Sequence, residues 1–355
     1  MDYTIDPSAP LGDEVRRIGA VQVEAALAVL DDPGNDVVAA VHDCRKRGKK
    51  LRGLARLVRP GLGDDYRRAN ILFREAAREL SELRDAHALL ATFDVLVAAP
   101  PAPLPGDGLG PVRAELQRRS RDASERARPD AVELDRARTL LEDARRLVET
   151  WELDDDFDVV AAGVAKTYGR GRAALEAAIS DPSGENFHEY RKRTKYTWYH
   201  ARLLEELAPS VLGPLAAALH DLSDVLGDEH DLAVLDQQLV AEPAAFGGDD
   251  TVDAARVLIA VRRTALQDRA VRLGRRLHAE TPKAFVRRLG AYWGAWHEYG
   301  EELDAGEIAD VWPPVADDLD QLTVEKLRQR ARDKDVEGRS DLRRSELIGA
   351  LRAET

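Results

Sequence analysis

Apolar residues recur every three or four positions along most of this 355-residue chain, a spacing that places them on one side of an α-helix. The same stretches are rich in Ala, Leu, Arg and Glu, which all favour helices. The alternation of apolar and polar residues that indicates strands does not extend over a useful length. Breaks rich in Pro or Gly divide the pattern near residues 33–35, 60–63, 100–111, 181–184, 209, 243–250 and 282. The pattern therefore predicts an all-α fold of antiparallel helices joined by loops.

The chain also repeats itself. Residues 41–46 are echoed by residues 187–192, so that His42 and His188 match at an offset of 146 residues. Residues 83–87 are echoed by residues 226–230, with His87 and His230 at an offset of 143 residues. Two such similar offsets indicate an internal duplication. We therefore expect two pseudo-symmetric helical bundles, a first half over about 10–150 and a second over about 157–300.

The character of the chain changes after this duplicated part. Residues 301–320 are rich in Asp and Glu and predict an acidic linker. Residues 321–355 contain two short amphipathic stretches, the first with Thr323 as its capping residue. This piece is too small to build a large core, so we expect a small helix-loop-helix module.

A cationic stripe runs along the helix predicted after Pro33. At about 100° per residue, the basic side chains of this segment fall on one face, and Cys44, Leu51, Leu54 and Val58 fall on the other. Like charges at this spacing repel by roughly a few tenths of a kcal/mol per pair, so an anion that neutralises them would explain their presence. The alternative is an ordinary solvated face paired with acids of neighbouring helices. The stripe consists of His42, Arg45, Lys46, Lys49, Arg52 and Arg56, with Lys50 beside it.

The second half carries the same stripe in a reduced form. His188, Arg191, Lys192, Lys195 and Arg202 occupy the phases of their first-half counterparts. Two positions differ, because Tyr196 replaces Lys50 and Trp198 replaces Arg52. We therefore expect a lopsided site, with a fuller first half and a thinner second half.

Composition restricts the classes of function. The net charge of −13 argues against a polyanionic partner for the chain as a whole, yet residues 45–59 contain eight Lys or Arg and no acid. Cys44 is the only cysteine, which excludes an intramolecular disulfide and a thiolate metal cluster. No apolar run approaches the roughly 20 residues of a membrane span, and no signal peptide is visible. We expect a cytoplasmic protein without a membrane partner.

These motifs resemble the CHAD family of duplicated helical domains. The resemblance covers about residues 10–300, through residues 42–52, 83–85, 168–172, 188–196 and 226–231. It implies two four-helix bundles, a basic surface that binds inorganic polyphosphate, no catalytic activity and, in some members, association with polyphosphate granules. Arg170 and Arg172 lie in one of the matching segments, and we expect them to approach the same surface. Binding should depend strongly on salt, because phosphate contacts release counterions.

Other functions remain open at this level. Histidines at matched positions, with Asp85, Asp228 and Asp231, suggest a metal site, but no helix offers His-x-x-x-His or Glu-x-x-His, and we expect neither a metal nor a cofactor. A metal-dependent phosphohydrolase, or a phosphoryl intermediate on His42, lacks supporting motifs, since no P-loop, nucleophile elbow or acidic tunnel motif is present. The histidines are expected to form hydrogen bonds near the phosphate site or to cap their helices.

The C-terminal segment has a resemblance of its own. Residues 322–327 and 336–348 are similar to the small N-terminal module of Rho transcription terminators and to SAP-like modules. This implies contact with nucleic acid through Arg339, Arg343 and Arg344. A module that binds protein is the alternative. A nucleic-acid-binding protein that combines this module with the basic face is thus the second functional hypothesis.

Overall fold

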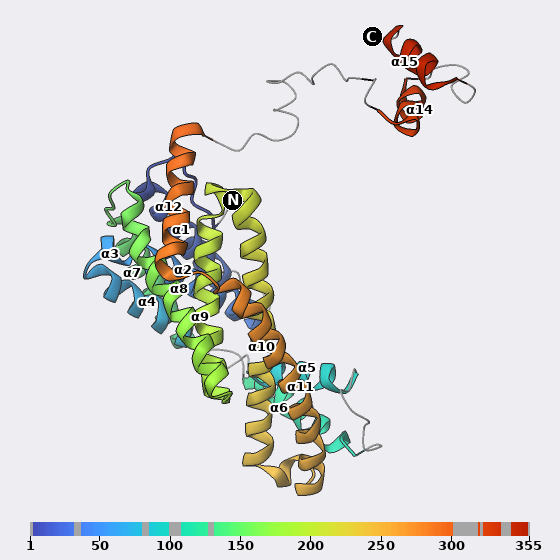
Figure 1. Cartoon of the computed structure of the whole chain (residues 1–355). Helices are drawn as coiled ribbons and strands as arrows, with labels where there is room; N and C mark the ends of the chain where they lie inside the picture. The colour runs from blue at the N-terminus through green and yellow to red at the C-terminus, as the bar shows by residue number, and fades with distance from the viewer. Residues whose placement is uncertain are drawn as a thin grey trace. The chain divides into compact units, whose positions relative to one another are not determined.

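A computed structural model describes residues 3–31, 37–79, 85–98, 108–126, 131–300, 319, 322–334 and 342–353. All regular structure in these residues is helical, which confirms the all-α fold (Figure 1). None of the described helices is long and apolar enough to cross a membrane. Two compact units are present, Met1–Gly300 and Glu301–Thr355.

The first half of the duplicated part contains seven of the described helices. They are α1 (Leu11–Asp31), α2 (Val37–Leu57), α3 (Arg59–Leu62), α4 (Asp65–Glu79), α5 (Asp85–Ala98), α6 (Gly110–Arg126) and α7 (Ala131–Glu149). The second half contains longer helices and two short 3-10 turns. These are α8 (Phe157–Ser180), α9 (Gly184–Leu203), η1 (Glu205–Leu207), α10 (Pro209–Ala241), η2 (Pro243–Phe246), α11 (Asp249–Leu277) and α12 (Pro282–Tyr299).

The helix order of one half matches that of the other at an offset of about 146 residues. By this offset α1 corresponds to α8, α2 to α9, α6 to α11 and α7 to α12. The single 33-residue helix α10 corresponds to α4 and α5 together. The duplication seen in the sequence is therefore present in the helices as well.

The hairpin of α5 and α6 belongs to the first half in sequence but packs with the second half. Leu89, Phe93 and Leu116 share a buried cluster with Leu235 and Leu258 of α10 and α11. Figure 1 shows α5, α6, α11 and the C-terminal half of α10 grouped at the lower end of this unit. A second buried cluster joins α1, α2, α4 and α7 to α8, α9 and α12. The two halves are thus interleaved, which the repeat alone did not predict.

Capping side chains set several helix starts. Asp156, Ser183 and Thr281 accept hydrogen bonds from backbone N–H groups in the first turns of α8, α9 and α12, which satisfies donors that a helix start leaves open. The start of α9 at Gly184 also places His188 in the second turn. Neither histidine caps its helix, because α2 likewise begins at Val37, five residues before His42.

The unit Glu301–Thr355 contains α14 (Val324–Asp333) and α15 (Arg344–Ala353). Thr323 accepts a hydrogen bond from the N–H of Lys326, as the sequence predicts for the capping residue. Leu327, Ala331 and Leu347 lie in a small core between the two helices. The predicted acidic linker and Arg339 lie outside the described residues, apart from Leu319 within the linker.

Candidate anion-binding site

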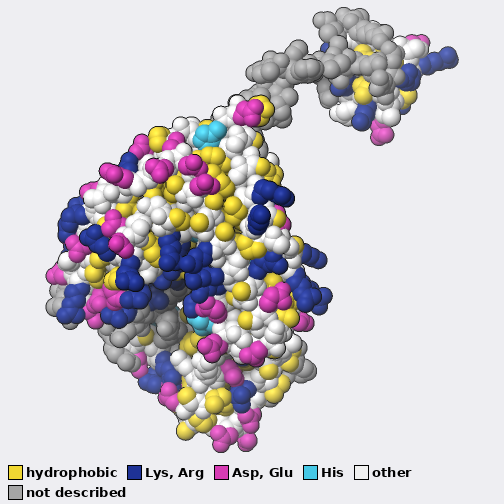
Figure 2. Space-filling model, turned by 60° about the vertical axis from the view of Figure 1, so that its left-hand side comes forward, with side chains coloured by type: hydrophobic (Ala, Val, Ile, Leu, Met, Phe, Trp, Pro, Cys, Tyr) yellow, Lys and Arg dark blue, Asp and Glu magenta, His cyan; other side chains and the backbone are white. Residues whose placement is uncertain are grey.

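The helix α2 buries the side that its sequence predicts. Cys44, Leu51, Leu54 and Val58 are all buried, while His42 and Lys46 are exposed. The remaining cationic side chains of the stripe are half-buried: Arg45, Lys49, Lys50, Arg52 and Arg56. These side chains are thus partly covered by neighbouring parts of the fold. Figure 2 shows Lys and Arg side chains gathered in the middle of one face of this unit, beside a hollow.

The helices α2 and α9 cross where Gly53 meets Tyr199. A Cβ on Gly53 would lie only 3.0 Å from the Cβ of Tyr199. His200 is buried next to this contact, and its Nε2 lies 3.2 Å from the carbonyl oxygen of Gly53. Because 53 and 199 are also separated by 146 residues, equivalent positions of the two halves meet here. The crossing brings the two cationic stripes onto one surface.

Arg56 occupies the centre of this surface. Its guanidinium lies over the ring of Tyr196 at 4.1 Å and donates to the carbonyl oxygen of Arg52 at 3.0 Å. Burial, followed by the charges of Arg52 and Arg193, lowers the pKa of Arg56. No ion pair between Arg56 and an acid occurs among the described residues. Folding therefore places a poorly solvated cation next to other cations, which an anion would stabilise.

Tyr3 from the N-terminal segment contacts both helices at the crossing, through Lys50 of α2 and Tyr199 of α9. Its buried hydroxyl donates to the carbonyl oxygen of Lys50 at 2.7 Å, and the Lys50 ammonium lies 5.0 Å from the centre of its ring. The ring also packs edge-on against Tyr199. Burial raises the pKa of Tyr3, an effect that the nearby charge of Arg202 opposes. An aromatic ring thus lies beside Lys50 and within the field of Arg202.

His188 is paired with a histidine of the second repeated motif. Its Nδ1 lies 3.2 Å from the Nδ1 of His230 on α10. Burial, together with nearby positive charge, lowers the pKa of both rings, that of His230 to about 4. One ring can donate to the other only if at least one of them is neutral. The prediction that His188 forms a hydrogen bond fits this pair.

Other predicted side chains of α9 differ in their surroundings. Lys192 forms an ion pair with Glu189 at 2.6 Å, so its charge is partly neutralised. Lys195 lies 5.8 Å from the centre of the Trp198 ring, and Trp198 stacks on Tyr199. Arg191 lies beside Gly227 of α10. The side chains of the second stripe thus lie against an acid, an aromatic ring and the neighbouring helix α10.

Arg170 and Arg172 do not act as a pair, because both lie inside α8 and point in different directions. Arg172 donates to the carbonyl oxygen of Glu280 at 2.6 Å, on the connection between α11 and α12. Arg170 is exposed, and its charge, together with that of Arg59, lowers the pKa of Lys166. The structure therefore places Arg170 near Lys166 and Arg59, and Arg172 at the connection between α11 and α12.

Elsewhere on the molecule, arginines are commonly paired with acids. Arg118 contacts Glu115 and Asp122 on α6, and Arg263 contacts the fully buried Glu229 at 2.7 Å. On the far side of α2 itself, Arg47 pairs with Asp43 at 2.6 Å. Arg52 and Arg56, in contrast, have no acidic partner among the described residues, although the chain has an excess of acids.

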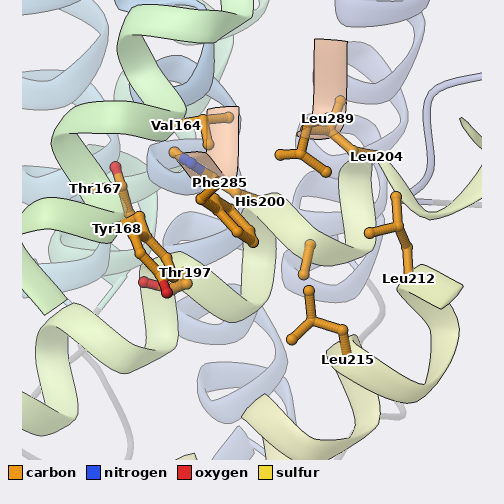
Figure 3. A pocket seen from close by; sticks show the side chains of 11 residues that line it. Val164, Thr167, Tyr168, Thr197, His200, Leu204, Leu212, Leu215, Phe285 and Leu289 are labelled. Carbon is orange, nitrogen blue, oxygen red and sulfur yellow. The ribbon is translucent and has the colours of Figure 1, made fainter. Parts of the chain in front are cut away.

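An internal cavity lies behind the helix crossing, but it does not fit an anion. It measures about 10 Å³ and is lined mainly by apolar side chains, with Thr167, Thr197 and His200 as the polar exceptions (Figure 3). A space of this size holds at most one water molecule. Within the described part of the chain, no group of three or more His, Cys, Asp or Glu side chains is placed to hold a metal ion.

A family model described as the CHAD domain matches residues 17–240. The match spans more than half of the chain and includes every residue of the predicted site. The protein belongs to the CHAD family. No curated protein matches the chain at a significant level. The match ends within α10, whereas the core continues into the helices that follow, since Leu258 and Phe285 are buried in the same clusters. The compact unit Met1–Gly300 thus extends beyond the matched residues and includes α11 and α12.

The CHAD surface also contains residues that the sequence did not single out. Asn70 of α4 accepts a hydrogen bond from Arg52 at 3.3 Å, and Tyr66 lies under the guanidinium of Arg59 at 4.5 Å. Tyr3 and Arg193 complete the surroundings of the crossing. Arg59 could have been found, because it ends the acid-free run of basic residues. The others belong to elements whose position next to α2 only the fold reveals.

Proposed function

We propose that the unit Met1–Gly300 binds inorganic polyphosphate on the cationic surface where α2 and α9 cross, and that it performs no chemistry on this ligand. The observation that carries the proposal is Arg56, which is half-buried, lies among Arg52 and Arg193, and has no acidic partner among the described residues. A bound anion would remove the cost of keeping this charge in the folded protein.

The shape of the surface favours an extended anion over a compact one. Exposed Lys46 and half-buried Arg52 and Arg56 are spread along several turns of α2, and the stripe of α9 continues from the crossing. Linear polyphosphate offers negative charges along a line and little other shape to recognise. Arginine suits such a ligand because its guanidinium binds phosphate oxygens in pairs.

Membership of the CHAD family supports the same ligand, since CHAD domains are associated with polyphosphate binding. The motifs of a phosphohydrolase were not found in the sequence, and His188 is engaged with His230. We accordingly propose a binding protein, with a location in the cytoplasm at polyphosphate granules as part of the proposal.

Competition between ligands tests the proposal. Long-chain polyphosphate is compared with single-stranded and double-stranded nucleic acid at matched salt, using the full chain. We expect polyphosphate to bind more tightly, and its affinity to fall steeply as salt increases. Tighter binding of nucleic acid, retained in a chain that ends at Gly300, would contradict the assignment and favour the second hypothesis.

A charge-reversal variant locates the binding surface. Changing Arg45, Lys49 and Arg191 to Glu should abolish binding while the helical content measured by circular dichroism is preserved. The matched control changes Arg68, Arg146 and Arg256 to Glu, because these arginines pair with acids away from the crossing and the net charge changes equally. Equal loss of affinity in both variants would indicate a nonspecific charge effect.

A further inference from the structure

A groove on α4 lies next to the proposed polyphosphate site. It has a volume of about 570 Å³ and is bounded by the start of α3 and the turn before α4. Three arginines line it, Arg59, Arg67 and Arg74, together with Tyr66 and Asn70. The sequence did not predict a site here, because these residues come from three separate elements.

The groove adjoins the surface of α2. Asn70 accepts a hydrogen bond from Arg52 at 3.3 Å, and Tyr66 lies close enough to Arg56 to affect its pKa. Tyr66 also lies under the guanidinium of Arg59 at 4.5 Å. The groove therefore adjoins the part of α2 that carries Arg52 and Arg56.

The positive charge of the groove continues onto α8. The charges of Arg59 and Arg170 both lower the pKa of Lys166, which means that these three exposed cations lie near one another. Within the described residues, none of them forms an ion pair. Two acids reduce the charge of the groove: Asp64 lines it, and Glu75 pairs with Arg74 at 2.8 Å. Arg59 and Arg67 remain without an acidic partner in the described part of the chain.

Resting on the proposed function, we propose that this groove is a second binding segment for the same polyphosphate chain, and that it makes binding depend on chain length. A short chain fills only the crossing of α2 and α9. A long chain continues past Arg56 and lies over Arg59, Arg67 and Lys166. The lining of the groove is mostly charged or polar, with Ile71 as the apolar exception. Such a lining suits a phosphate chain that keeps much of its hydration.

The test compares two probes, tripolyphosphate and long-chain polyphosphate, on the full chain. The groove variant combines Arg67→Glu with Lys166→Glu. The control variant combines Arg68→Glu with Arg146→Glu, which changes the net charge equally in the adjacent groove between α4 and α7. All three proteins are titrated with both probes over a range of salt concentrations.

We expect the groove variant to bind long-chain polyphosphate about tenfold more weakly, with a salt dependence lower by about one to two released ions. Its affinity for tripolyphosphate should equal that of the unchanged protein, and the control variant should behave normally with both probes. Unchanged affinity of the groove variant for long chains would overturn the inference and leave the crossing as the whole site. Equal weakening with both probes would also overturn it, since the groove would then be part of the primary site. If the unchanged protein binds neither probe, the proposed function itself fails.

Discussion

Individual residues at the crossing and at the end of α11 carry charges or polar groups that folding holds in an unfavourable state. Arg56 is kept among cations, and the imidazole of His200 is fully enclosed, with its Nδ1 lacking a hydrogen-bond partner in the described structure. Burial lowers the pKa of His200 to about 3 and that of His278 to about 4. The protonation of these buried histidines therefore affects the stability of the fold.

Protonation of the buried histidines should destabilise the protein in mild acid. Their pKa values are near 6.5 in the unfolded chain and about 3 to 4 in the folded protein. Between these values the unfolded state binds more protons, so the free energy of unfolding decreases as the pH falls below about 6.5. Each such group contributes up to about 1.4 kcal/mol per pH unit. Urea denaturation at several pH values measures this slope.

The variant His200→Gln serves as the control for this prediction. Its side-chain amide can still donate to the carbonyl oxygen of Gly53, the partner of His200, but it does not titrate. The decrease in stability between about pH 6.5 and pH 4 should become shallower by about one proton. An unchanged slope would contradict the proposed cause.

Two helices can approach each other closely where one of them has a glycine, because glycine has no side chain. A Cβ on Gly163 of α8 would lie 1.9 Å from the carbonyl oxygen of Leu57 at the end of α2. At this contact α8 packs closely against the end of α2. Arg59, which follows α2, and Lys166 of α8 lie near one another in the same region. Glycine is otherwise unfavourable inside a helix by about 1 kcal/mol relative to alanine.

Gly163→Ala should therefore destabilise the protein by about 3 kcal/mol or more, because a backbone oxygen cannot move aside without displacing a helix. Gly294→Ala in α12 is the matched control, since a Cβ there meets nothing within 4 Å. It should stabilise the protein by about 0.5–1 kcal/mol. Thermal unfolding of the two variants measures both effects, and equal stabilities would show that the close approach is absent in solution.

At the scale of elements, the sequence predicted which side of each helix is buried better than it predicted which helices pack together. The apolar side of α2 is buried as expected, because helical periodicity determines which residues share a side. Periodicity does not identify the partner helix. It therefore could not place α5 and α6 against α10 and α11, direct Arg172 toward Glu280, or bring Asn70 to Arg52. Contacts of this kind depend on the three-dimensional path of the chain.

The whole molecule consists of two units with separate cores. Leu327 and Leu347 are buried within the C-terminal unit, and the clusters of the larger unit contain none of its residues. A chain that ends at Gly300 should therefore keep its fold and its affinity for polyphosphate within about twofold. Isothermal titration of the full and shortened chains checks this. A much weaker shortened chain would mean that the C-terminal unit takes part in binding.

The contact of Gly53 with Tyr199 has a consequence for how such a protein can arise. In a symmetric dimer of identical half-chains, a residue on the two-fold axis meets its own copy. Two tyrosines could not occupy the space that is filled here by one tyrosine and one glycine, since even a Cβ on Gly53 is crowded. Joining the halves into one chain frees the two positions to differ. Covalent fusion thus permits an unequal contact between equivalent positions, and with it two halves whose side chains can differ.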